Sequence, residues 1–341
     1  KLAAFCARFS ASPEMRIDAL DMLANWANPD PRDRVLGAYR PLKERSAKVA
    51  SDALSAHIDA LMTAEDVVRE KAIETAAGLG LTKIVPRLLE RVKNVDQRPS
   101  LRANALRALA RLAPKQAVAM AKEVTLVPTT TLVPAALDVL GRLDPQGSIA
   151  KFVEATNSRD TRVRQLAWDI LATIDHPKAT ETVAAGLKKY LDGSLPTDSQ
   201  LNVIEAAEVK LNDSLKESLA EHIRKLAEAD PLGPWLASLE GGDAERGAKI
   251  FHEKTEVSCL RCHKVDRAGG EVGPNLTVIG KQRDRRYLLE SICLPDAQIA
   301  KGFETAVIAN DFGQVYTGIV KSENDDYVEL MENDGSQRRI D

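Results

Sequence analysis

Two cysteines and a histidine lie within five consecutive residues, Cys259-Leu-Arg-Cys262-His263, in a chain that holds only four cysteines and five histidines. This is the spacing of covalent c-type haem attachment. Two thiols on one helical turn can reach the two vinyl groups on one edge of a porphyrin, and the adjacent imidazole can then bind the iron. The motif therefore predicts one covalent haem c, held by Cys259 and Cys262, with His263 as the proximal iron ligand.

Two other chemistries also use paired thiols. A structural zinc site needs four ligands. After the motif the sequence offers one further cysteine, Cys293, but no second cysteine pair and no histidine. A thioredoxin-like redox pair needs alternating strands and helices around it, which the flanking sequence does not show. Both alternatives, and a chance occurrence of the motif in a folded domain, stay open beside the haem.

The chain that must position this motif is expected to be mainly α-helical. Aromatic residues make up only 4% of it, whereas alanine and leucine are abundant, and this favours packed helices over a β-sandwich. Up to about residue 230, one pattern recurs: an apolar residue, then alanine four positions later, then a second apolar residue directly after the alanine. Its occurrences are Met15/Ala19/Leu20, Val68/Ala72/Ile73, Leu101/Ala105/Leu106, Leu132/Ala136/Leu137 and Val163/Ala167/Trp168.

The spacing of these alanines indicates repeats. The last four are 33, 31 and 31 residues apart, whereas the first gap of 53 residues indicates an irregular unit or insertion between residues 25 and 60. One such unit cannot bury its apolar stripe alone, so stacking is expected, with the small residue allowing close approach of helices. The pattern resembles HEAT repeats. That resemblance implies an α-solenoid of about six helical hairpins over residues 1–232, serving as a spacer or docking scaffold.

Nothing in this helical region indicates catalysis. Its histidines, His57, His176 and His222, are scattered along the sequence and do not cluster with Asp or Cys. Cys6 is expected to be a small buried apolar residue.

The composition changes near residues 232–242, where proline and glycine interrupt the helical pattern. Asp243 is expected to cap a helix that runs into the cysteine motif, and helix is expected again at about 284–293. From Phe303 the hydrophobic period changes to two, which indicates strands. The sequence thus predicts a second domain, 243–341, with a helical core at 243–302 and a small antiparallel β-meander at 303–341.

The surroundings of the motif resemble the class I cytochrome c family. Gly247 and Phe251 precede it on a helix, and Gly273-Pro274-Asn275-Leu276 follows it. In that family the glycine and the aromatic residue pack against the haem-bearing turn. The resemblance implies that Pro274 accepts a hydrogen bond from His263, which orients the imidazole and makes it a stronger donor.

The same resemblance extends the predicted haem contacts. It implies that Phe251, Pro274 and Leu276 contact the haem, and that Tyr287 and Leu288 close one haem edge. Arg285, Arg286 or Lys281 could pair with a propionate, although a solvated basic patch is an equal alternative.

Residues 243–341 are more narrowly similar to the haem-binding module of the Planctomycetes and Verrucomicrobia type, in which a helix like "ESICLP" leads into a β-meander. Members of that family often carry HEAT-like repeats before the module. Longer members begin with a β-propeller resembling sugar or sorbosone dehydrogenases. The resemblance implies that Lys1 follows such a propeller and that the chain is part of a longer dehydrogenase.

The sixth iron ligand departs from the class I pattern, because Thr305 stands where a methionine would be expected. The candidates within the chain are Met331, His252 and, more weakly, Lys301. An open or water-bound sixth site is the main expectation. No distal acid–base pair follows the motif, so peroxidase-type chemistry is not favoured.

The sequence leads to one main functional prediction and two alternatives. The first is electron transfer, in which the haem accepts electrons from a dehydrogenase domain or partner protein. The second is an open-site haem sensor whose solenoid docks a protein, and the third is part of an enzyme whose catalytic domain lies elsewhere. A net charge of −3 argues against nucleic acid as a partner, and no apolar run is long enough for a membrane span.

Haem attachment also predicts a compartment. Covalent attachment takes place outside the cytoplasmic membrane, so a periplasmic or otherwise extracytoplasmic location is expected. The remaining cysteines, Cys6 and Cys293, lie in different predicted domains, and a disulfide between them has no support in the sequence.

Overall fold

The structure is a computed structural model that describes residues 1–33, 36, 38–126, 131–332 and 335–340. It is mainly helical, with a small antiparallel sheet at the C-terminal end, as the sequence predicted. The chain forms two compact units, 1–185 and 186–341. The expected boundary near 232–242 lies inside the second unit. The predicted domains, 1–232 and 243–341, stay predictions, because compactness does not establish which segments fold alone.

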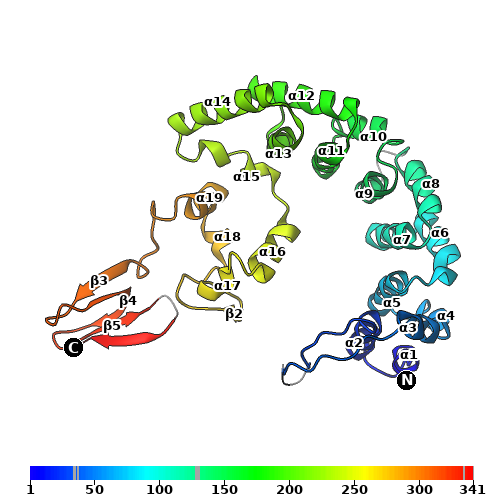
Figure 1. The fold of residues 1–341 in the computed structure, drawn as a ribbon, viewed down its shortest axis with the longest axis horizontal. Helices are drawn as coiled ribbons and strands as arrows, with labels where there is room; N and C mark the ends of the chain where they lie inside the picture. The colour runs from blue at the N-terminus through cyan, green and yellow to red at the C-terminus, as the bar shows by residue number, and fades with distance from the viewer. Residues whose placement is uncertain (34–35, 37, 127–130, 333–334, 341) are drawn as a thin grey trace. The chain divides into compact units, whose positions relative to one another are not determined.

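The first unit is built from helices joined by short connections, except for residues 25–46 between α2 and α3 (Figure 1). They are α1 Leu2–Cys6, α2 Pro13–Ala24, α3 Ala47–Ser55, α4 Ile58–Leu61, α5 Asp66–Gly78, η1 Thr82–Ile84, α6 Val85–Lys93, α7 Pro99–Leu112, α8 Pro114–Val124, α9 Val133–Leu143, α10 Ile149–Ala155, α11 Thr161–Thr173 and α12 Pro177–Leu191, the last of which continues into the second unit. Prolines at the first turns of α2, α6, α7, α8 and α9 fit the helix start, where the missing N–H has no intrahelical partner.

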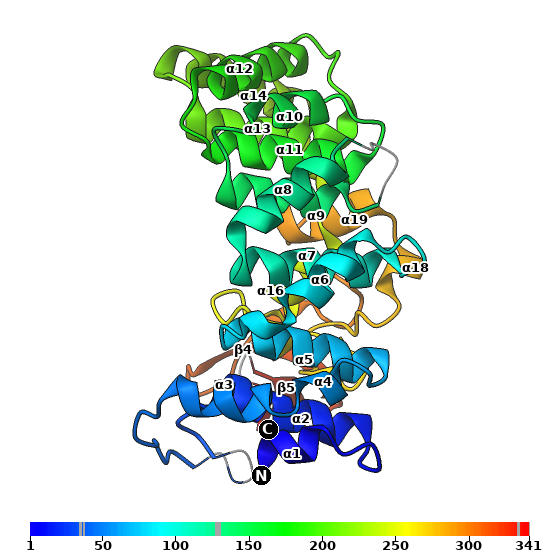
Figure 2. The ribbon, with the colours of Figure 1, turned by 90° about the vertical axis from the view of Figure 1, so that its right-hand side faces the viewer.

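The alanine pattern marks a continuous line of helix contacts. Helix α2 packs against α5, α5 against α7, α7 against α9 and α9 against α11, and Figure 2 shows them following one another from α2 upward. The five alanines are at most 4% exposed, which confirms that they lie on the inner face. The irregular unit expected between residues 25 and 60 comprises residues 25–46, whose described part holds an isolated bridge between Arg32 and Tyr39 but no helix, and then α3 and α4.

Helix α2 departs from the pattern at its first position. Met15 is 59% exposed, and Arg16 is buried in its place, in line with Ala19 and Leu20. The Arg16 guanidinium donates from Nε to the Cys6 carbonyl at 2.7 Å and from Nη1 to Glu65 Oε1 at 2.8 Å. Cys6 is fully buried, as predicted, and its burial raises the pKa of the thiol to about 11.

The second unit continues with helices and ends in the sheet. Its helices after α12 are η2 Thr197–Ser199, α13 Gln200–Lys210, α14 Asp213–Ala229, η3 Gly233–Trp235, α15 Ser238–Gly241, α16 Ala244–Glu253, α17 Cys259–Cys262, α18 Ile279–Gln282 and α19 Arg285–Cys293. A short hairpin, β1 Lys264–Val265 with β2 Ala268–Gly269, follows α17. The Asp243 side chain caps α16 by accepting from the Arg246 N–H at 2.9 Å, as the sequence predicted.

The C-terminal sheet is an antiparallel meander in the order β3-β4-β5-β6, and Figure 1 shows its strands side by side near the C-terminus. The strands are β3 Thr305–Ala309, β4 Val315–Glu323, β5 Val328–Met331 and β6 Gln337–Ile340. An irregularity between Val320 and Ser322 shifts the register of β4 on β5. Helices long and apolar enough to cross a membrane are absent from the part of the chain that the structure describes.

The buried guanidinium of Arg16 generates a stability prediction. Replacing it in Arg16→Met keeps an apolar stem but leaves the Cys6 carbonyl without its side-chain donor and Glu65 without its cation. We expect the free energy of unfolding to fall by about 2–3 kcal/mol in urea titrations followed by circular dichroism. The matched control, Arg162→Met, changes an exposed residue of α11 and should alter stability by less than about 0.5 kcal/mol. Equal stability of both variants would contradict this assignment.

Candidate functional site

The cysteine motif forms the single helical turn α17, directly before the β1–β2 hairpin. Ser258 enters the turn with a left-handed φ of 46°, and the His263 N–H closes it by donating to the Cys259 carbonyl at 3.0 Å. Because residues three apart lie on the same face of a helical turn, the two sulfurs project to one side. Both cysteines are half-buried free thiols. The turn therefore has the local geometry that attachment to one edge of a planar group requires.

The imidazole of His263 is held by a backbone carbonyl. Its Nδ1 lies 3.0 Å from the Pro274 oxygen, which can only accept, so Nδ1 carries the proton. The other ring nitrogen, Nε2, then has a free lone pair and can bind a metal. This is the contact that the resemblance implied for Pro274.

Glycines allow the loop after the hairpin to fold back onto the motif. A Cβ on Gly273 would lie 2.8 Å from Cε1 and 2.9 Å from Nδ1 of His263. A Cβ on Gly270 would lie 2.1 Å from the Arg261 carbonyl. The N–H groups of these two glycines donate to the carbonyls of Cys262 and Leu260 at 2.7 and 2.8 Å. Any larger side chain would push the loop away from the imidazole.

A polar network fixes the far side of the same loop. The Leu276 N–H donates to the Lys264 carbonyl at 2.8 Å, and the Asp266 N–H donates to Thr277 Oγ1 at 2.7 Å. Asn275 Oδ1 accepts from both the N–H and the hydroxyl of Thr277, at 2.9 and 2.6 Å. These bonds hold the segment that contains Pro274 at two points, so the carbonyl that orients His263 has little freedom to move.

The segment that contains the motif buries no side chain. Every residue from 243 to 302 is described, and each is half-buried or exposed. The first unit, by contrast, fully buries side chains such as Leu106 and Leu137. A folded segment of this length normally buries a large share of its surface. Its half-buried apolar residues could be covered by a large apolar group; they include Phe251, Leu260, Val265, Leu276, Tyr287, Leu288 and Leu289.

The predicted haem contacts lie on three elements of the segment. Phe251 is on α16, which packs against α17, and its ring lies 5.4 Å from that of His252 in an edge-on arrangement. Leu276 is in the returning loop, while Tyr287 and Leu288 are on α19, where the Arg283 guanidinium stacks 4.5 Å from the Tyr287 ring. The close packing implied for the glycine of α16 is not seen, because a Cβ on Gly247 would meet no atom within 4 Å.

The candidates for the sixth iron ligand lie in different settings. Met331 is 6% exposed in β5, where it is paired with Ile319 and Gln337, and its burial is typical of a packing residue. His252 and Lys301 are exposed, on α16 and in the turn before β3. Each stays a prediction as a ligand.

Two arginines considered for a propionate have partners within the protein. Arg285 Nη1 donates to the Leu239 carbonyl at 3.0 Å and lies 3.4 Å from Glu240 Oε2. Arg286 pairs with Asp230 at 2.8 Å. The pKa of Asp230 is lowered by the Leu232 N–H and then by Arg286. These contacts attach α19 to residues 230–240, a stretch that the sequence had suggested as the domain boundary.

The donor set fits a haem better than a zinc ion. Among the described residues, no three His, Cys, Asp or Glu side chains gather where they could hold a metal ion. A structural zinc ion needs four protein ligands, whereas a haem would need only Cys259 and Cys262 for attachment and His263 as a ligand. Comparison of the chain with protein-family models and with curated protein sequences finds no match.

Sequence reasoning identified the motif and Pro274 but not the contact role of Gly270 and Gly273. The sequence does contain a signal for a close approach of the loop, because three glycines follow the motif within eleven residues of His263. Spacing alone could not reveal which of them touches the imidazole.

The close approach of Gly273 generates a second prediction. In Gly273→Ala the new methyl group would displace the imidazole and break its bond to Pro274. We expect nitrogen NMR of the histidine side chains in the full chain to lose the Nδ1-protonated form of His263. Gly280→Ala is the control, because a Cβ there meets no atom within 4 Å. An unchanged His263 signal in Gly273→Ala would refute the contact.

Proposed function

We propose that this protein transfers electrons through one haem c bound covalently by Cys259 and Cys262, with His263 as the axial ligand. The single observation that carries the proposal is the contact between His263 Nδ1 and the Pro274 carbonyl, 3.0 Å long, directly beside the two free thiols. It supports the proposal because a metal-binding histidine commonly donates its other ring N–H to a carbonyl. When bound, a haem c supplies a one-electron iron couple whose potential depends on axial ligation and burial.

The residues of the chain have distinct tasks in this proposal. Cys259 and Cys262 would hold the haem through thioether bonds to its two vinyl groups. The Pro274 carbonyl polarises the Nδ1–H bond of His263 and makes Nε2 a stronger donor, which would favour the oxidised state of a bound iron. The apolar side chains of residues 243–302, Phe251, Leu276, Tyr287 and Leu288 among them, exclude water. We also propose that residues 243–341 form a class I cytochrome c module of the Planctomycetes and Verrucomicrobia type.

Residues 1–232 are proposed to form the scaffold, a HEAT-like solenoid. The support is the line of contacts from α2 to α11 through buried alanines. The electron donor in this scheme is a dehydrogenase domain or partner protein, and the location is periplasmic or otherwise extracytoplasmic, because the attachment chemistry takes place there.

An open-site haem sensor is the second candidate. The observation that favours it is the burial of Met331 within the sheet, because a methionine packed between strands is less available to iron. In this version His263 would still hold the iron, and a small molecule or water would bind the iron in place of a protein ligand.

The test is expression of the chain with haem-maturation machinery, followed by visible spectra of the oxidised and dithionite-reduced protein. We expect covalent haem that survives denaturing electrophoresis and is lost in the double variant Cys259→Ser/Cys262→Ser. The matched controls Cys6→Ser and Cys293→Ser should retain it. Absence of covalent haem in the parent chain, with or without bound zinc, would overturn the proposal.

The same preparation separates the two functions. Low-spin spectra in both oxidation states support electron transfer, and a methionine-to-iron charge-transfer band that disappears in Met331→Leu identifies that ligand. High-spin spectra that shift on addition of carbon monoxide favour the sensor instead.

A further inference from the structure

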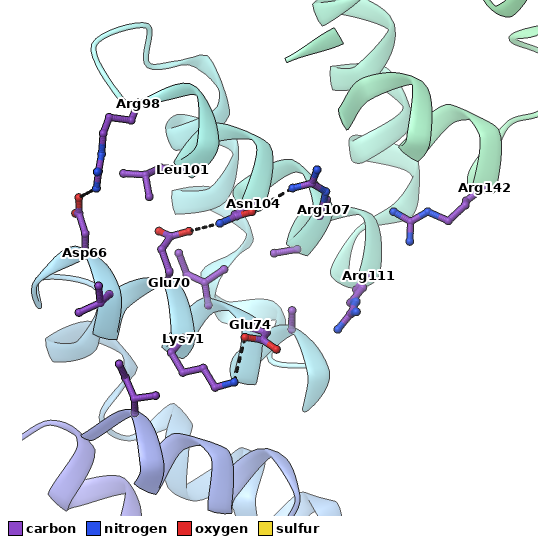
Figure 3. A pocket seen from close by; sticks show the side chains of 15 residues that line it. Asp66, Glu70, Lys71, Glu74, Arg98, Leu101, Asn104, Arg107, Arg111 and Arg142 are labelled. Carbon is purple, nitrogen blue, oxygen red and sulfur yellow. Dashed lines mark hydrogen bonds and ion pairs between the residues drawn. The ribbon is translucent and has the colours of Figure 1, made fainter. Parts of the chain in front are cut away.

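The first unit contains a pocket of about 590 Å³ that the proposed redox function does not use. Its wall is built from α2, α5, α7 and α9, so it crosses four helices of the line described above. Figure 3 shows its charged side chains from close by. A water molecule takes about 30 Å³ in the liquid, so the pocket is far larger than one inorganic anion requires.

The charges in the pocket are unevenly matched. Eight charged residues line it, of which five are basic and three acidic, although the whole chain carries a net charge of −3. Each acidic residue already has a cation. Asp66 pairs with Arg98, Glu70 with Arg91 at 2.5 Å, and Glu74 with Lys71 at 3.2 Å. The acidic side of the pocket is therefore neutralised from within the protein.

The basic side is not neutralised in the same way. Arg111 has no hydrogen-bond or ion-pair partner among the described residues, and Arg107 only donates to the neutral Asn104 Oδ1, at 3.2 Å. Arg142 from α9 pairs with Asp138 on its own helix at 2.7 Å. In Figure 3, Arg107, Arg111 and Arg142 gather at one end of the pocket. At this end of the pocket, the guanidinium groups of Arg107 and Arg111 have no carboxylate partner among the described residues.

The repeat explains how these arginines come together. Arg107 and Arg111 are four residues apart on α7 and therefore share a face. Arg111 and Arg142 each lie six residues after a buried repeat alanine, Ala105 and Ala136. Because α7 packs against α9, equivalent positions of successive repeats become neighbours. Apolar residues also contribute to the wall, namely Ile17, Val67, Ile73, Ala77, Leu101 and Ala108.

We infer that this pocket binds an acidic peptide segment of a partner protein, with its carboxylates on Arg107 and Arg111 and an apolar side chain against the exposed Val67. A guanidinium group binds a carboxylate through two parallel, charge-assisted hydrogen bonds. Lysine cannot form this paired contact, so arginine is the better residue for binding carboxylates. The apolar wall and the volume favour a peptide over a small free anion. The inference does not depend on the haem.

The experiment measures fluorescence anisotropy of a labelled peptide, in which pairs of glutamates alternate with single leucines, titrated with the full chain. We expect the double variant Arg107→Gln/Arg111→Gln to weaken binding about tenfold, and added salt to weaken binding by the parent chain. The matched control is Arg162→Gln, which removes an exposed arginine of α11 outside this pocket and should bind like the parent.

Three outcomes would overturn the inference. The first is equal binding by the parent and the double variant. The second is equal binding of a peptide with glutamine in place of glutamate. The third is tight binding of inorganic phosphate to Arg107 and Arg111 without peptide binding, which would make the pocket a small-anion site. Circular dichroism of each variant separates loss of binding from loss of fold.

Discussion

The bond between His263 Nδ1 and the Pro274 carbonyl joins the cysteine motif to the loop that returns to it, and the candidate site depends on this contact. It selects the tautomer that leaves Nε2 available, and it does so beside two thiols on one turn. The bond exists only because the loop returns to the motif, and the return is permitted by glycines whose missing side chains leave room for backbone and imidazole. A change in this loop would therefore alter the chemistry of His263 without touching the histidine.

The two parts of the chain reach stability by different means. The first unit buries many alanines and leucines between successive helices. Residues 243–302 bury none and are held by hydrogen bonds, short turns and the ion pairs that join α19 to residues 230–240. A segment of this second kind gains most from a bound apolar group, because the group would supply the buried area that the segment lacks.

The same repeat that builds the core also arranges surface chemistry. Inward positions carry alanine, while the exposed face at the end of α7 and α9 carries arginine at equivalent places. A scaffold made in this way can present several copies of one charged group to a single extended ligand, which a lone helix cannot do. The buried Arg16 shows the opposite use of the same residue type, since its charge is matched inside the first unit by Glu65 and the Cys6 carbonyl.

The sequence by itself determined the features that depend on neighbours within a few residues. These are the thiol and imidazole spacing of Cys259, Cys262 and His263, the helical stripe of alanines, the cap at Asp243 and the period of two in the C-terminal sheet. Only the tertiary structure decided which distant groups come together: Gly273 against His263, Arg16 in place of Met15, Arg286 on Asp230, and Arg107 and Arg142 in the wall of one pocket. Local patterns specify relations between near residues, whereas loop returns and packing between helices depend on the shape of the whole surface that each side chain meets.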